Sequence, residues 1–258
     1  MRLVILFFFT LILLSGCSNE KPKLKSWSLN NTIGWKPTNP PNFNYSMVLE
    51  TYVNEIEKTK SPLISAQKLS GLVSFVINGK SKGDSINVYG SWNNHEGIEF
   101  VLYFGKGLNS NHLKTNLKDS EVPSNYFELG LDIFDTTSVV SLFKYNKANQ
   151  LLDSIRFIKI LTYPKDNDPS FPIQYIVNQK IISGNYIMTD DKGVKSNVAF
   201  NNDGTVTGFP NFKNYYISTD FLGGPIPTFD EIIFDVNLPT MKSYVLKKML
   251  ILLIYLPQ

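Results

Sequence analysis

The chain has 258 residues and a formal net charge of +3, and its 25 basic residues include only two arginines, Arg2 and Arg156. Phosphate-binding grooves favour arginine or basic stretches interleaved with aromatics, which this lysine-dominated sequence lacks, so we expect no nucleic-acid partner. Apolar residues make up 43% of the chain and aromatic residues 13%. That is enough to bury a core, and the single cysteine excludes an intrachain disulfide.

Residues 1–17 have the organisation of a secretory signal. Arg2 gives a positive start, residues 3–14 are apolar apart from one threonine, and Leu14-Ser15-Gly16-Cys17 closes the segment. Such a stretch is too short to span a bilayer. Its last four residues resemble the lipobox of bacterial lipoproteins. In that family the peptide is cut before the cysteine, so the resemblance implies acylation of Cys17 and attachment to a membrane through its acyl chains. A plain signal peptide or a short membrane anchor containing Cys17 are the alternatives.

The next residues fit the same interpretation. Residues 18–23 are polar and suit a tether, and Ser18 rather than aspartate follows the cysteine. By resemblance to lipoproteins of bacteria with two membranes, this implies the outer membrane rather than retention at the inner one. The predicted organisation is a signal peptide at 1–16, then the lipidated cysteine, tether and an irregular lead-in at 17–43. A β-rich globular domain follows at 44–258.

An amphipathic helix is predicted over about 46–60. Its apolar face, at helical spacing, consists of Leu49, Tyr52, Val53 and Ile56. Asn44 or Ser46 can cap its start, and Pro62 ends it. We expect this face to pack on a sheet. One further helical turn is expected at about 112–117.

Strands dominate the rest of the chain, because from residue 69 onward the apolar period changes from about 3.6 to about 2. The expected strands are 73–78, 86–92, 98–104, 126–134, 139–145, 152–163, 181–189, 194–201, 205–209, 215–220, 231–237 and 243–256. Asp203-Gly204 predicts a type I′ hairpin turn, in which both central residues have positive φ. The fold class is therefore mainly β, an antiparallel barrel or sandwich with one N-terminal amphipathic helix. It forms one domain or two halves split near 164–170.

A second resemblance lies in residues 181–237. Gly184-Asn185-Tyr186, Phe200-Asn201-Asn202-Asp203-Gly204 and Tyr215-Tyr216-Ile217 resemble lipocalin-like and other small β-barrel lipoprotein domains. In those domains a Gly-x-Tyr strand precedes a Phe-x-x-Asp-Gly hairpin. The segment departs from lipocalins because no extended helix follows its strands. The resemblance implies a barrel rather than a sandwich.

The sequence offers no catalytic constellation. The two histidines, His95 and His112, are not at the spacing of metal ligands, and we predict no metal site and no cofactor. A Gly-x-Ser-x-Gly elbow is absent from the sequence. Glu96 and Glu99 flank His95 in an expected hairpin, where a solvated turn is the favoured interpretation. We therefore assign no catalytic residue.

The aromatic surplus is the remaining indication of function. The candidate ligand-binding residues are Trp92, Tyr89, Tyr103, Tyr215 and Tyr216. Their rings could line a groove, although core and cross-strand pairing use the same residues and are the favoured role. The preferred function is a lipid-anchored cell-envelope lipoprotein that serves as a non-enzymatic binding or structural module. Its partner would be a small apolar ligand, a sugar or an envelope protein. The alternative is an extracytoplasmic hydrolase that uses loop carboxylates or a dispersed triad, which a pocket with converging titratable side chains would favour.

Overall fold

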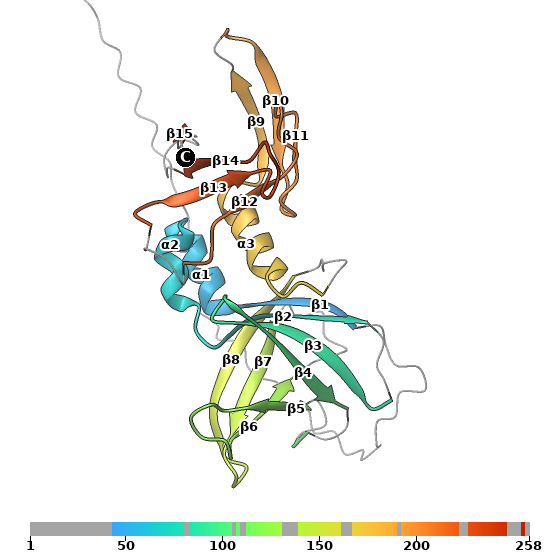
Figure 1. The fold of residues 1–258 in the computed structure, drawn as a ribbon. Coiled ribbons are helices and arrows are strands. Elements are labelled where there is room, and N and C mark those ends of the chain that lie inside the picture. The colour runs from blue at the N-terminus through green and yellow to red at the C-terminus, as the bar shows by residue number, and fades with distance from the viewer. Residues whose placement is uncertain are drawn as a thin grey trace, which may run out of the picture. The chain divides into compact units, whose positions relative to one another are not determined.

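Eight antiparallel strands, joined in sequence order, close into a barrel in the computed structural model (Figure 1). The structure describes residues 43–79, 83–104, 107–108, 112–130, 139–160, 167–189, 192–221, 227–246 and 254–255. The barrel strands are β1 (Phe43–Leu49), β2 (Leu72–Gly79), β3 (Ser85–Trp92), β4 (Glu96–Tyr103), β5 (His112–Lys118), β6 (Tyr126–Gly130), β7 (Val139–Tyr145) and β8 (Leu151–Ile160). β8 closes onto β1, with Leu49 opposite Phe157. The predicted mainly β fold is confirmed, and of the two architectures it is the barrel that forms.

The inward positions of the barrel strands carry large apolar side chains that pack on one another. Phe75, Phe100 and Phe157 are buried, and the ring centroid of Phe75 lies 6.1 Å from that of Phe100 and 5.0 Å from that of Phe157. At Gly90 an added Cβ would lie 2.8 Å from Leu72 Cδ1, so the packing leaves no space there for a side chain. An eight-stranded barrel is just wide enough for its own side chains. This part of the interior is therefore a core and not a ligand chamber.

Helix α1 (Glu50–Thr59) begins later than predicted. Residues 46–49 belong to β1, where Met47 pairs with Phe75 on one side and with Lys159 on the other. These residues pair with β2 and β8 to close the barrel and are therefore not helical, although their apolar spacing fits both a strand and a helix. The expected caps at Asn44 and Ser46 are wrong for the same reason, and α1 starts after Leu49 without a side-chain cap.

The apolar face of α1 and its C-terminal end agree with the prediction. Tyr52, Val53 and Ile56 are buried. The helix ends at Lys60, which has a φ of 53° and donates its N–H to Ile56 O at 2.9 Å. Helix α2 (Pro62–Ser65) and the 3₁₀ turn η1 (Ala66–Lys68) then lead into β2.

The sequence does not predict helix α3 (Phe171–Ile181), which follows the barrel. Its residues are apolar around most of the circumference, so no amphipathic stripe marks it. Pro172 stands in its first turn, where the missing N–H has no intrahelical acceptor to lose. The helix buries Ile173, Ile176 and Val177, and it contacts β1, β2, α1 and β12 (Tyr215–Ile217). The expected strand at 181–189 consequently begins only at Gly184.

The helical turn expected at about 112–117 is wrong. These residues form β5, which pairs with β4 and β6. Leu113 is opposite Leu129 and Thr115 is opposite Leu102, so both residues lie beside buried barrel positions. Pairing on both sides therefore outweighs the local helical pattern.

Two smaller sheets follow α3 (Figure 1). One contains β9 (Gly184–Thr189), β10 (Lys195–Phe200) and β11 (Val206–Thr207) in the order β11-β10-β9. The other contains β12, β13 (Asp230–Phe234), β14 (Lys242–Leu246) and β15 (Ile254–Tyr255). A bridge between Thr205 and Asn214 joins the two sheets. The residues that carry the resemblance to small β-barrel domains lie in these two sheets, outside the closed barrel.

Side-chain hydrogen bonds connect the barrel and its helices to the residues after β8. Ser74 Oγ donates to Pro169 O at 2.6 Å, and Asp230 Oδ1 accepts the N–H of Leu63 at 2.9 Å. No helix among the described residues is long and apolar enough to cross a membrane. Cys17, the tether and the lead-in up to residue 42 lie outside the described residues. So do 164–166 of the predicted split near 164–170, and 247–253 and 256 of the strand expected at 243–256.

Candidate functional site

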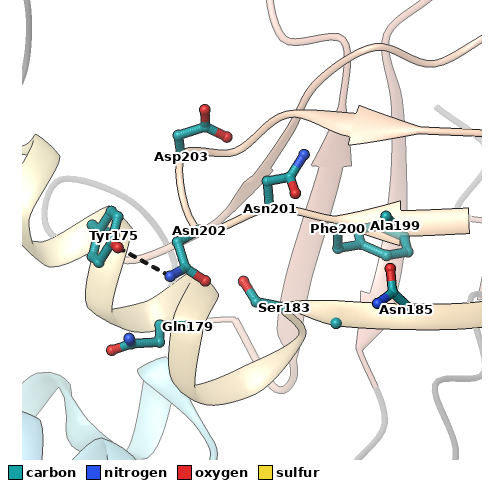
Figure 2. Close-up of a pocket in the computed structure, with 10 residues that line it drawn as sticks. Tyr175, Gln179, Ser183, Asn185, Ala199, Phe200, Asn201, Asn202 and Asp203 are labelled. Carbon is teal, nitrogen blue, oxygen red and sulfur yellow. Dashed lines mark hydrogen bonds between the residues drawn. The ribbon is translucent and has the colours of Figure 1, made fainter. Parts of the chain in front are cut away.

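A polar cleft of about 650 Å³ lies between the C-terminal half of α3 and the β9–β10 sheet (Figure 2). Small-molecule sites typically have volumes of about 300–1,000 Å³. The polar lining is rich in amide groups and consists of Tyr175, Gln179, Ser183, Asn185, Asn201, Asn202 and Asp203. Ala199 and Phe200 of β10 add a small apolar area. The cleft therefore has the size and the mixed lining of a binding site.

The turn after β10 forms one rim of the cleft. Asn201 N–H donates to Thr205 O at 2.9 Å, and Gly204 N–H donates to Asn201 O at 3.1 Å. Within this turn only Gly204 has a positive φ, 84°, so the predicted type I′ turn is wrong. The geometry is that of a type I turn followed by a glycine bulge. The predicted need for glycine at 204 is nevertheless correct.

Hydrogen bonds from neighbouring elements hold this rim in place. Asn178 Nδ2 of α3 donates to Asn202 O at 3.0 Å, and Tyr215 Oη of β12 donates to Asn201 O at 2.7 Å. Burial raises the pKa of Tyr215, which keeps its hydroxyl protonated and able to donate. Asp203 Oδ1 accepts the N–H of Thr205 at 3.0 Å. The rim is thus ordered by α3, by β12 and by its own turn before any ligand is bound.

Tyr175 places an aromatic ring at the side of the cleft. Its hydroxyl accepts a hydrogen bond from Asn202 Nδ2 at 3.1 Å, which links α3 to the turn (Figure 2). On its other side the ring packs against Phe171, with the centroids 5.8 Å apart. The ring and the Asn202 amide therefore fix each other's position.

Ser183 lies at the junction of α3 and β9. Its N–H donates to Asn178 O at 2.9 Å, and its Oγ is buried. The Ser183 hydroxyl lies beside that of Tyr215, and a hydrogen bond between them lowers the pKa of Tyr215, an effect smaller than that of burial. Ser183 therefore belongs to the buried support of the cleft, next to Tyr215.

The described lining of the cleft contains no acid–base pair. Among these residues Asp203 is the one carboxylate, and none is lysine, arginine or histidine. The nearest basic residue on α3, Lys180, forms an ion pair with Glu57 at 2.5 Å. General acid–base catalysis needs two groups that can exchange protons with the substrate. The lining therefore suits binding better than hydrolysis.

The five aromatic candidates from the sequence do not line this cleft. Tyr89 and Trp92 lie on β3 and Tyr103 on β4, whereas Tyr215 and Tyr216 lie on β12. Tyr215 is buried and supports the rim through its hydroxyl. These residues therefore lie in the barrel and in one smaller sheet, and Tyr215 supports the rim of the cleft.

The two histidines lie apart and each faces a carboxylate. His95 Nδ1 is 2.9 Å from Asp220 Oδ2, and His112 Nδ1 is 3.2 Å from Glu128 Oε2. The His95–Asp220 pair could form part of a triad, but the cavity lined by Asp220 has only about 60 Å³, and its described lining residues include no serine. Among the described residues no cluster of three metal-ligating side chains is present.

The chain matches no protein-family model, no curated protein and no solved structure in the comparisons made. The site must therefore be interpreted from its own geometry.

Sequence reasoning missed the amides of the cleft because Asn, Asp and Gly are also the usual turn formers. Asn201-Asn202-Asp203-Gly204 fully explains a hairpin without any ligand. Gln179 belongs to the helix that the sequence does not predict. The available signal is the density of amides on both sides of that hairpin, which only the fold brings together.

Proposed function

We propose that this chain is a lipid-anchored lipoprotein of the cell envelope, attached through Cys17, whose globular part binds a small polar ligand without catalysing a reaction. The observation that carries the binding function is the ordered, amide-lined cleft at α3, β9 and β10. Its lining groups donate and accept hydrogen bonds, and their positions are fixed by contacts outside the cleft. Such preorganisation lowers the cost of binding.

The structure of the barrel also supports this proposal. In ligand-binding barrels the ligand occupies the interior, but here Phe75, Phe100 and Phe157 fill the described part of that space. The barrel is then a rigid body that carries α3 and the two smaller sheets. Binding is assigned to the cleft and not to the barrel.

The membrane anchor is proposed from the signal-like segment and the Leu-Ser-Gly-Cys motif. A single acyl chain gives only marginal attachment, whereas two or more give stable anchoring. Polar residues 18–23 would separate the acylated cysteine from the folded part.

A screen of a small-molecule library tests the binding function. The full chain, purified in detergent, is heated with each compound, and compounds that raise the melting temperature are retested on Asn202→Ala and on Asn54→Ala. Asn202 lines the cleft, whereas Asn54 is an exposed amide on α1. We expect hits whose stabilisation is lost only in Asn202→Ala. A library without any hit that depends on the cleft contradicts the binding function.

Labelling with radioactive palmitate tests the anchor. We expect the wild-type chain and the neighbouring variant Ser18→Ala to incorporate the label and sediment with membranes. Cys17→Ala should incorporate none. Undiminished labelling of Cys17→Ala would refute attachment at this residue, even if an uncleaved signal keeps the variant in the membrane.

A further inference from the structure

The charge distribution around the cleft disfavours an anionic ligand. Among its ten described lining residues none carries a positive charge, and Asp203 carries a negative one. α3 presents its C-terminal end to the cleft, through Gln179 and the residue after its cap, Ser183. A helix C-terminus has partial negative charge, whereas anions bind at the N-terminus. Phosphorylated, sulfated and carboxylated ligands would therefore be repelled.

A cationic ligand is disfavoured for a different reason. Asp203 is exposed, and its Oδ1 already accepts hydrogen bonds from Thr205 N at 3.0 Å and from Thr205 Oγ1 at 2.7 Å. One exposed carboxylate attracts a cation only weakly in water. The cleft contains no second carboxylate among its described lining residues that would strengthen this attraction.

The remaining polar groups match hydroxyl groups. Amide side chains both donate and accept hydrogen bonds, as does a hydroxyl. Gln179 and Asn185 have side chains without a hydrogen-bond partner among the described residues, and Figure 2 shows them on either side of Ser183. Ser183 Oγ itself is buried beside the Tyr215 hydroxyl. Two exposed amides with free hydrogen-bonding capacity thus line the same cleft.

An aromatic ring and a small apolar area accompany these groups. Tyr175 is held by Asn202 on α3's side of the cleft, and Ala199 and Phe200 lie on β10. Rigid aromatic faces pack against apolar C–H surfaces while the ring edge remains available to polar groups. Molecules with alternating C–H faces and hydroxyl edges are saccharides.

We infer that the cleft binds a neutral, hydroxyl-rich ligand of the saccharide class, with Tyr175 as the packing surface and Gln179 and Asn185 as hydrogen-bonding groups. This inference rests on the proposed binding function of the cleft and names the class of its ligand. Because the rim of the cleft is already ordered, binding needs little rearrangement of the turn at residues 201–204.

Saturation-transfer difference NMR on the full chain tests this inference. The chain is purified in a detergent without a sugar headgroup, since a glycoside detergent would compete. The neutral probes are maltotriose and triacetylchitotriose, glucose 6-phosphate is the anionic probe, and spermidine is the cationic one. Each is titrated to about 10 mM, which detects dissociation constants in the millimolar range.

The site is tested with Gln179→Ala and Asn185→Ala, two exposed amides without structural hydrogen bonds. The matched control is Asn54→Ala, an exposed amide of α1. We expect at least one neutral trisaccharide to bind and each cleft variant to raise its dissociation constant about two- to twelvefold, the effect of one neutral hydrogen bond. The control should leave the dissociation constant unchanged.

Three results would overturn the inference. If only glucose 6-phosphate or spermidine binds and the cleft variants weaken it, the ligand class is wrong while the binding function stands. If a trisaccharide binds equally to the cleft variants, the site is wrong. If neither trisaccharide binds, the saccharide class is rejected, and cleft-dependent hits from the library screen decide separately whether the cleft binds another ligand.

Discussion

His112 Nδ1 lies 3.2 Å from Glu128 Oε2, and the Glu128 side chain is only 2% exposed. Both oxygens of this carboxylate also accept the N–H of Leu108 at 3.0 Å. The His112 ring stacks on Phe143, with the centroids 4.6 Å apart. Burial is the largest cause that raises the pKa of Tyr126 and of Tyr145, and the charge of Glu128 is the second largest. One buried carboxylate therefore organises the region where β5, β6 and β7 meet.

Glu128→Ala should destabilise the fold by about 3 kcal/mol, because it removes the buried carboxylate that accepts the N–H of Leu108 and faces His112. Urea unfolding followed by tryptophan fluorescence measures the change. The control is Glu121→Ala, whose exposed side chain should change the free energy of unfolding by less than about 0.5 kcal/mol. Equal effects of the two substitutions would show that the buried carboxylate does not stabilise the barrel.

Gly204→Ala should destabilise the rim of the cleft more than a comparable substitution elsewhere. Gly204 has a φ of 84°, and an added Cβ would lie 2.9 Å from Tyr215 O. Gly193 has a φ of 78°, but a Cβ added there would meet no atom within 4 Å. Gly193→Ala thus measures the strain of positive φ alone, about 1 kcal/mol, and Gly204→Ala should cost about 1–3 kcal/mol more. Identical melting temperatures would mean that the turn moves away from the clash.

Most barrel strands can be predicted from the sequence because their residues alternate between a buried and a more exposed face. The predicted strand at 139–145 has the bounds of β7. The start of α1 is mispredicted because Met47 and Leu49 fit a strand and a helix equally well, and only the pairing with β2 and β8 decides. α3 escapes prediction because Ile173, Ile176 and Val177 are buried in a helix with little amphipathic contrast.

The cleft could not be predicted either, because its residues come together only through tertiary pairing. Gln179 and Asn185 lie on a helix and a strand, and the turn at 201–204 approaches them only when β9 and β10 pair. Each residue alone has an ordinary local explanation. The combination of free amides and an aromatic ring exists only in three dimensions.

The contact between His95 and Asp220 joins the β3–β4 hairpin to residues 219–220. It should make the stability of the fold depend on pH. The hydrogen bond with Asp220 and the charge of Asp220 raise the pKa of His95. Because the folded-state pKa is the higher one, the stabilisation is fully present below the unfolded value of about 6.5. It is lost as pH rises through the folded-state pKa. Both side chains are nearly half exposed, so the effect should be small.

Melting temperatures of the wild type and His95→Gln, measured between about pH 5 and 9, test this dependence. The wild type should be the more stable at the acidic end, and the difference should vanish at the alkaline end. Asp220→Asn should remove the same pH dependence, because it removes the charge that His95 faces. A difference that is constant over this range would contradict the assignment.

Asp119 should contribute to stability with the opposite pH dependence. Its Oδ2 lies 2.6 Å from Lys144 Nζ and accepts a hydrogen bond from Asn125 Nδ2 at 2.8 Å. The hydrogen bonds from Lys144 and then from Asn125 hold the pKa of Asp119 well below its usual value. A lowered folded-state pKa means that the stabilisation is fully present above the unfolded value of about 3.9. It is lost as pH falls from there through the folded-state pKa.

The free energy of unfolding of the wild type and Asp119→Asn, compared from about pH 6 to pH 2.5, measures this contribution. We expect the wild type to be more stable at pH 6 and the difference to shrink steadily with acid, since protonated Asp119 no longer pairs with Lys144. Asp153→Asn is the matched control, because Asp153 is exposed and stands opposite Lys144 in the β7–β8 pairing. If Asp153→Asn shows the larger pH-dependent loss, the exposed carboxylate and not Asp119 is the main partner of Lys144.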